Sequence, residues 1–377
     1  MNLSMNKNMA LGSVALFGLA LGQAQKIPDR PEKLTFPPLI YDAPNPADYR
    51  VELESGAVVY IYPDRERPLI DLSVNVRGGS YLDPKGKEGL AGLTGYLMAR
   101  GGIPSSPADK LDEELEFLAA RLSSSFGGLS GSVGLNLLSK DTDRGFEILR
   151  AVLAAPSFQE DKLALRKTQT LQGLKQRNDD SKNIESRERN FLAYGERFWF
   201  NRHTTAASLE NIRREDLLAF HHEWVHPQNF IVSVSGDFDR DEMLKRLDGV
   251  FAAWPHPGKK APPVPQEQKY GKPGVYIVNK DVNQGRVSIM LPGIRWDAPD
   301  YYAIQVMNDV LGGGGSRRAS PTACAPMRAW LTRRVRRSPG GCITRWCFAL
   351  GSSPSRARSP TRRRSCSRRS SASPGSR

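Results

Sequence analysis

The first 323 residues of the 377-residue chain contain no cysteine, since all four cysteines lie near the end, at Cys324, Cys342, Cys347 and Cys366. This long body can therefore hold neither a disulfide nor a cysteine-based metal site. From residue 316 onward the chain lacks lysine, aspartate and glutamate but contains 16 arginines. Without this tail, 38 basic residues stand against 40 acidic ones, a net charge of −2, whereas the whole chain carries +14. The basic character belongs to the tail alone.

A second feature that the chain lacks is an apolar run of the roughly 20 residues that a transmembrane helix needs. The run from Met9 to Leu21 follows Lys7 and precedes Gly22-Gln23-Ala24. This order is typical of a secretory signal peptide, here residues 1–24, and the alternative is a buried N-terminal helix. We therefore predict an exported protein, periplasmic or secreted, without a transmembrane segment. The proline-rich residues 25–48 are predicted to be an extended lead-in.

From Tyr49 to residue 255 the pattern predicts an α+β domain in which strands and helices interleave irregularly. Residues 70–76 alternate between apolar and polar side chains, which predicts a half-buried strand with Ile70, Leu72, Val74 and Val76 inward. Further strands are expected at 58–62 and 230–235, and a hairpin at 123–138. Helices are expected at 87–100, 111–122, 142–154, 160–177, 184–194, 214–224 and 239–251.

A linker is predicted at residues 256–273, which are rich in proline, lysine and glycine. After it the opening pattern returns, with paired strands expected at 275–278 and 286–291 and a helix at 299–311. The same order of strand, strand, helix and glycines occupies residues 58–102. We interpret residues 274–315 as the start of a second, truncated copy of the first domain.

The segments Gly79–Gly102 and Phe220–Phe238, together with the second copy, resemble the pitrilysin/insulinase zinc metallopeptidases. The resemblance runs from about Tyr49 to Gly315. It implies a fold class of α+β, with tandem metallopeptidase-like α/β units, an antiparallel sheet packed with helices in each, and a chamber between the units. The first unit would be complete and the second truncated.

The resemblance also implies a zinc site that this chain has lost. The family carries HxxEH on its first helix, where two histidines bind zinc and the glutamate takes a proton from the bound water. Here the first histidine falls on Gly92, the glutamate on Gly95 and the second histidine on Tyr96. The third ligand, a glutamate, falls at or near Gly173. We expect no catalytic residue, no metal and no cofactor at these positions. Two glycines within one helix are unfavourable, so we also expect another backbone packed closely over Gly92 and Gly95.

A different zinc motif, HExxH, occurs at His222, Glu223 and His226. Its use would need both histidines on one continuous helix. Pro227 follows His226 directly and disfavours helical backbone there. We therefore interpret His221, His222 and His226 as the surface end of a structural helix, with an active zinc site at His222, Glu223 and His226 as the alternative.

The tail, residues 316–377, is predicted to be disordered because it is rich in arginine, serine and proline without apolar periodicity. We interpret it as a frameshift. With suitable codons, Cys324 to Thr332 read in a frame shifted by one base encode Arg-Ser-Asp-Glu-Gly-Leu-Ala-Tyr, which resembles a motif that the family has after Gly315.

The sequence thus predicts a non-catalytic homologue of these peptidases. The resemblance implies an accessory subunit that pairs with a homologous zinc-bearing peptidase subunit and contacts peptide or unfolded polypeptide. No nucleic acid is expected as a partner. The alternatives are an active zinc metallopeptidase that uses His222, Glu223 and His226, and a basic nucleic-acid-binding protein that acts through its arginine-rich tail.

Overall fold

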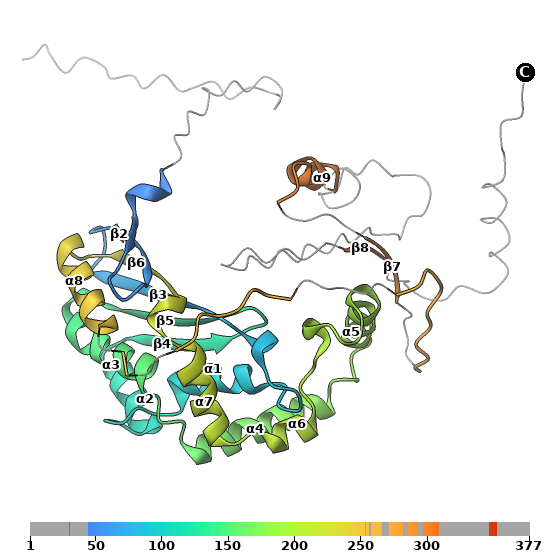
Figure 1. Ribbon diagram of the computed structural model, residues 1–377, viewed down its shortest axis with the longest axis horizontal. Coiled ribbons are helices and arrows are strands. Elements are labelled where there is room, and N and C mark those ends of the chain that lie inside the picture. Colours follow the sequence, from blue (N-terminus) through green and yellow to red (C-terminus); the bar gives the residue numbers. More distant parts are fainter. Residues whose placement is uncertain are drawn as a thin grey trace, which may run out of the picture. The chain divides into compact units, whose positions relative to one another are not determined.

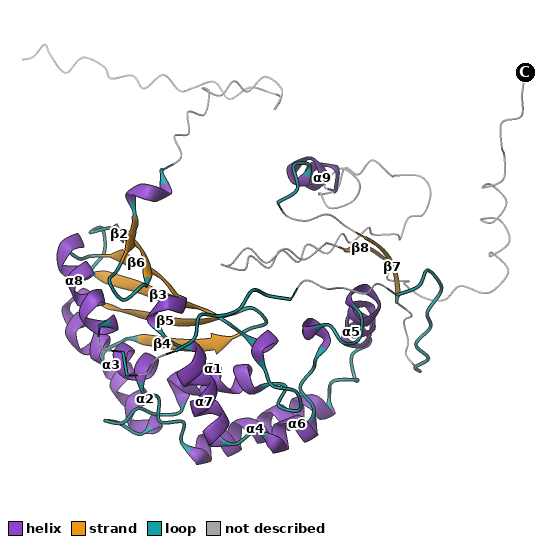
Figure 2. Cartoon of the chain, viewed as in Figure 1, coloured by secondary structure: helices purple, strands orange, loops and turns teal. Residues whose placement is uncertain are grey.

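The computed structural model describes Arg30 and residues 44–252, 254–255, 258–265, 271–281, 286–292, 297–308 and 347–352. The expected signal peptide lies outside the described residues, as does most of the tail. The described helices and strands all belong to the compact unit that begins at Pro46. They form one six-stranded sheet with helices, followed by a short second sheet and one more helix (Figures 1 and 2).

The main sheet has the strand order β1-β2-β6-β3-β5-β4. Neighbouring strands are antiparallel except for β2 and β6, which run parallel, so the sheet is mixed rather than wholly antiparallel as expected. The strands are β1 (Arg50–Glu52), β2 (Val58–Pro63), β3 (Leu69–Arg77), β4 (Arg121–Phe126), β5 (Ser130–Leu138) and β6 (Phe230–Gly236).

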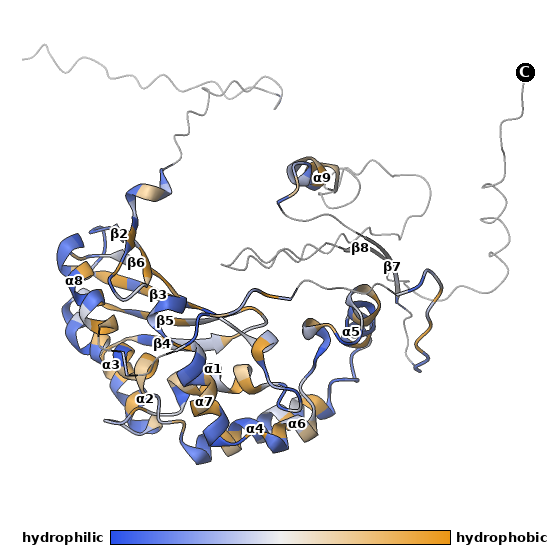
Figure 3. Ribbon diagram, in the orientation of Figure 1, coloured by the Kyte–Doolittle hydropathy of each residue, from blue (hydrophilic) through white to orange (hydrophobic). Residues whose placement is uncertain are grey.

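Helices cover one face of this sheet (Figure 1). The helices of the first domain are α1 (Leu90–Arg100), α2 (Ala108–Phe117), α3 (Thr142–Ala154), α4 (Glu160–Lys175), α5 (Ser181–Tyr194), α6 (Ala206–Asn211), α7 (Arg214–Trp224) and α8 (Arg240–Phe251). Of these, α5 lies away from the main sheet and next to β7 (Val287–Pro292) (Figure 1). Hydrophilic and hydrophobic residues share these helices, as in amphipathic helices that cover a core (Figure 3). Among the described residues, none of the helices combines the length and hydropathy of a membrane span.

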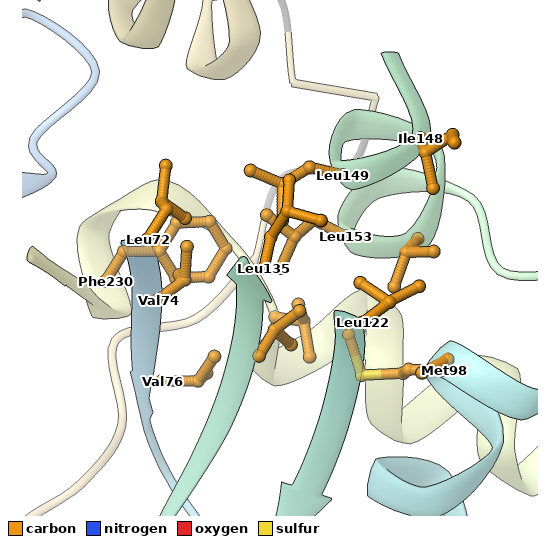
Figure 4. Close-up of a cluster of buried hydrophobic side chains, with 14 of the residues drawn as sticks. Leu72, Val74, Val76, Met98, Leu122, Leu135, Ile148, Leu149, Leu153 and Phe230 are labelled. Atoms are coloured by element: carbon orange, nitrogen blue, oxygen red, sulfur yellow. The ribbon is translucent and has the colours of Figure 1, made fainter. Parts of the chain in front are cut away.

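The core lies between the sheet and the helices. The inward side chains of β3 are Ile70, Leu72, Val74 and Val76, as the alternation predicted, and each is at most 3% exposed. Figure 4 shows Leu72, Val74 and Val76 facing side chains of α3 and neighbouring strands. On the opposite face, the residues of β3, β4, β5 and β6 that alternate with the core are mostly serine, asparagine and glycine, whereas β2 exposes Tyr60 and Tyr62 there.

The second sheet differs from the prediction in two ways. Strand β7 (Val287–Pro292) forms as expected, but residues 275–278 are exposed extended chain and not a strand. The partner of β7 is instead β8 (Cys347–Ser352), which lies in the range predicted to be disordered. That prediction does not hold for these six residues. They are free of arginine and mostly apolar, and the open edge of a strand readily pairs with such a segment. Helix α9 (Tyr301–Asn308) falls within the expected helix.

Candidate functional site

Helix α1 carries three of the four positions at which the resemblance places zinc chemistry, and its start is fixed by Asp83. The two carboxylate oxygens accept the backbone N–H groups of Gly89 and Ala91, each at 2.8 Å. Gly89 has φ of +107°, a conformation that favours glycine. These contacts start the helix at Leu90, three residues later than predicted. Burial raises the pKa of Asp83 to about 6, although the two N–H groups and Arg202 act in the opposite direction.

Gly95, the expected position of the catalytic glutamate, lies directly against the backbone of β4. A Cβ atom at this glycine would meet the backbone nitrogen of Phe126 at 2.2 Å. The expectation of a closely packed backbone is therefore confirmed here. No side chain larger than hydrogen fits at this position without moving the strand.

The close approach at Gly95 lets a hydroxyl from β4 enter the backbone hydrogen bonding of α1. Ser124 Oγ donates to the carbonyl oxygen of Gly95 at 2.5 Å and accepts the N–H of Ala99 at 2.9 Å. A regular α-helix would pair these two backbone groups with each other. Helix and strand are thus joined through the residue that the resemblance assigns to the general base.

Tyr96, the expected position of the second zinc ligand, faces an arginine from α4. The Cζ atom of Arg166 lies 3.9 Å from the centre of the Tyr96 ring, a cation–π contact. Arg166 also donates to Gln169 at 3.3 Å. The guanidinium is a fixed positive charge beside the position where the resemblance implies a metal ligand.

The two helices run antiparallel at this place. The N–H of Gln159, just before α4, donates to the carbonyl oxygen of Gly101, just after α1, at 3.0 Å. One and a half turns further, Tyr96 meets Arg166. Followed further from this contact, α1 leads to Gly92 and α4 leads to Gly173. The two helices that hold the four predicted positions therefore lie side by side.

Gly92 does not fit the expectation of close packing. Gly92 and Gly173 are both exposed, and a Cβ at either position would meet no atom within 4 Å. The prediction of a covering backbone is therefore wrong for Gly92, which lies on the outer face of α1, and Gly173 lies on the outer face of α4. Glycine has no ligand atom, whether it is crowded or open.

The second motif, His222, Glu223 and His226, is not on one helix. Helix α7 ends at Trp224, and His226 is extended, with φ of −156° and ψ of 161°. The N–H of Lys259 donates to the carbonyl oxygen of Glu223 at 2.8 Å, and its Nζ lies 2.7 Å from the Glu223 carboxylate. The Nε2–H of His226 donates to the carbonyl oxygen of Lys259 at 2.7 Å. Glu223 and His226 thus both form hydrogen bonds with Lys259 of the linker.

The environment of the histidines differs from the predicted helix end on the surface. His221 is fully buried, and its Nε2 donates to the carbonyl oxygen of Leu153 at 2.9 Å. His226 is 4% exposed and lies beside Asn229. His221 is buried because it faces Leu153 and the ring of Phe158, and His226 is buried because Lys259 of the linker covers the end of α7. Across the described part of the chain, no three histidine, cysteine or acidic side chains are grouped so that they could hold a metal ion.

Two residues of this region could not be found from the sequence. Arg166 and Ser124 carry no motif, and their positions depend on how α4 and β4 pack against α1. The only available signal was the pair of glycines in α1, which pointed to a close approach of another element. That signal was correct for Gly95.

The chain is similar in sequence to several known proteins. Residues 211–353 match the peptidase M16 inactive domain. The chain is 20% identical over 269 residues to an uncharacterised zinc protease of Rickettsia bellii, covering 71% of this chain and 64% of that protein. It is 26% identical over 275 residues to the non-peptidase homolog YmxG of Helicobacter pylori, covering 71% of this chain and 62% of that protein. The chain thus spans less than two thirds of the length of these relatives.

Solved structures share the fold. A peptidase M16 inactive domain from Pseudomonas fluorescens superposes with a TM-score of 0.68 at 23% identity, over 81% of this chain and 74% of that one. A protease from Helicobacter pylori gives 0.61 at 18% identity, with the same coverage of both chains. The periplasmic protease PqqL from Escherichia coli gives 0.52 at 16% identity, over 70% of this chain and 30% of that one.

Fold and comparisons together define an α/β domain of the peptidase M16 type. The resemblance to the pitrilysin/insulinase peptidases is confirmed, since residues 211–353 match the peptidase M16 inactive domain and the chain shares the fold of solved M16 structures.

Proposed function

We propose that this chain is a non-catalytic accessory subunit that pairs with a zinc-bearing homologue and contributes a wall to a peptide-binding chamber. The observation that carries the proposal is the contact of Gly95 with β4. A glutamate at this position would overlap the strand backbone, so the general base cannot be regained without rebuilding the sheet. The names of two relatives, a non-peptidase homolog and an inactive domain, support the same conclusion.

Peptide binding is supported by the position of β4. This strand lies at one end of the sheet order and directly beside α1. An extended peptide can add to a sheet edge through backbone hydrogen bonds, which gives affinity with little sequence selectivity. The serine-rich open face of β4 and β5, the two strands at this edge, offers further hydrogen-bonding groups. We expect export to the periplasm or beyond, as the N-terminal residues 1–24 suggest.

The test is a mixing experiment with an M16 homologue that has an intact HxxEH motif. We expect the full-length chain alone to contain far less than one zinc per molecule and to cleave no labelled peptide. With the homologue, we expect a co-eluting complex and faster cleavage than by the homologue alone. A separate monomer that leaves the homologue's activity unchanged would refute the accessory role.

The same preparation tests the two alternatives. One equivalent of zinc that is lost in His222→Ala but kept in His203→Ala would favour a zinc peptidase built on the second motif. His203 is a fair control because it lies outside the motif, in an edge-to-face contact with Phe191. Salt-sensitive DNA binding that disappears on deletion of residues 316–377 would favour a nucleic-acid-binding tail.

A further inference from the structure

Hydrogen bonds hold the linker against the first domain. Lys259 is fixed through its N–H, its carbonyl oxygen and its ammonium group, which contact Glu223 and His226. Asn229 adds two bonds, since its Nδ2 donates to the carbonyl oxygen of Lys259 at 2.8 Å and its Oδ1 accepts the N–H of Ala261 at 2.9 Å. The chain therefore enters the next residues, Pro262-Pro263-Val264-Pro265, from a fixed point.

These four residues lie against a separate cluster of aromatic side chains, which we call the aromatic cradle. The rings contact one another edge to face or stacked, and three of them are less than 10% exposed. Val264 packs against the cluster. The cradle consists of Tyr81, Tyr194, Phe198, Trp199 and Phe200.

Two side chains of the cradle donate hydrogen bonds to the linker backbone. Tyr81 Oη donates to the carbonyl oxygen of Pro262 at 3.0 Å, and Trp199 Nε1 donates to that of Pro265 at 3.1 Å. The two acceptors are three residues apart. A polyproline II helix has three residues per turn, so carbonyl groups at this spacing point to the same side. Proline has no N–H to offer, and a receptor for such a segment must supply donors, as Tyr81 and Trp199 do.

The segment rests on the surface and is not part of the core. Pro262, Pro263 and Pro265 are all exposed, whereas the rings of Tyr81, Phe198 and Trp199 are buried. It can therefore leave without opening the main core, and its departure would uncover the cradle. Aromatic surfaces with hydrogen-bond donors are the usual receptors for Pro-x-x-Pro segments, and Pro262 to Pro265 has this pattern.

We propose that the aromatic cradle is a binding site for a proline-rich segment of the Pro-x-x-Pro type, filled in this chain by its own linker. An external peptide of the same chemistry binds the cradle once the linker is displaced. The aromatic cradle takes no part in the proposed accessory role, so either proposal can fail while the other holds.

A fluorescent peptide with the sequence of residues 259–267 tests binding to the full-length chain. A release variant, Pro262→Gly/Val264→Ser/Pro265→Gly, weakens the resident segment. We expect the peptide to bind this variant at least about tenfold more tightly than the native chain. Adding Trp199→Phe, which removes one donor and keeps an aromatic ring, should weaken peptide binding about fivefold, as loss of one neutral hydrogen bond predicts.

Trp254→Phe is the matched control, because Trp254 Nε1 also donates to a carbonyl oxygen, that of Val225 at 3.1 Å, but away from the cradle. It should leave peptide affinity unchanged. Equal affinity of the native chain and the release variant, or equal effects of the two tryptophan substitutions, would overturn the proposal.

Trypsin gives a second readout in the chain without the release substitutions. Tyr81→Phe or Trp199→Phe should speed cleavage after Lys260 several-fold, while Trp254→Phe should not. Circular dichroism confirms that each variant is folded. Cleavage at the native rate in both cradle variants would show that the contacts do not hold the linker.

Discussion

The hydroxyl of Ser124 lies 2.5 Å from the carbonyl oxygen of Gly95, so a β4 side chain takes part in the backbone hydrogen bonding of α1. This contact requires a residue without a side chain on the helix. The packing of the domain, and not only the identity of one residue, therefore leaves no room for a glutamate at the position that the resemblance assigns to the general base.

The two glycines of α1 should respond in opposite ways to alanine. Gly95→Ala would push a Cβ into the β4 backbone, and we expect it to lower the free energy of unfolding by about 3 kcal/mol or more. Gly92→Ala meets open space and should raise it by about 0.5–1 kcal/mol through helix propensity. Urea denaturation of the two variants checks both signs. Equal effects would mean that β4 does not contact Gly95.

The contact between Arg166 and Tyr96 should be measurable as a coupling energy. A double-mutant cycle with Arg166→Met and Tyr96→Leu is expected to give about 0.5–1 kcal/mol. Tyr96→Phe keeps the ring and should preserve most of the coupling. A coupling energy of zero would show that the guanidinium of Arg166 does not contact the Tyr96 ring.

Asp83 should make stability fall as the pH rises from about 4 to about 6. Its pKa in the folded chain is about 6, above the ordinary value of 3.8, so the folded state binds more protons in this window. The loss amounts to about 2–3 kcal/mol and is complete above pH 6.

Asp83→Asn isolates this effect. The amide can accept only one of the two backbone N–H groups, so the variant should be less stable overall but lack this pH dependence. Glu114 changes stability in the opposite direction, since its hydrogen bond from Arg144 lowers its pKa. The difference between native chain and variant removes that contribution. Parallel pH profiles would contradict the assignment to Asp83.

Hydrogen exchange should separate the first domain from the chain beyond the linker. Backbone amides of residues 275–278, which are exposed and extended, should exchange at least roughly 100-fold faster than those of β3. We also expect fast exchange in residues 316–346. Slow exchange there would argue for a folded, selected segment and against a frameshift.

Local sequence pattern was enough for most elements of the first domain. The alternation in residues 70–76 gave the inward face of β3, and α3 and α7 have the predicted bounds. The strand expected at 275–278 rested on a continuous run of apolar residues, but a strand also needs a neighbour. In the structure, β7 pairs with residues 347–352, which lie more than 50 positions further along the chain. Local pattern cannot supply such a partner.

In the candidate site, too, some features follow from local sequence and others only from tertiary packing. The lack of a ligand atom at Gly92, Gly95 and Gly173, and the poor zinc ligand at Tyr96, follow from the residue types at the positions that the resemblance assigns. The hydroxyl of Ser124 and the guanidinium of Arg166 come from elements distant in sequence, and only tertiary packing brings them to α1.

The linker is tied down at Lys259, Pro262 and Pro265, and again at Gly271, whose N–H donates to the carbonyl oxygen of Leu192 at 2.7 Å. A free tether sets the local concentration of the part it carries by its contour length. A tether fixed at four points does not, because the residues between the last fixed point and the carried part set its reach. The free tether therefore begins at Gly271 and not at residue 256, and shortening the chain between Lys259 and Gly271 would strain these contacts before it shortened the reach.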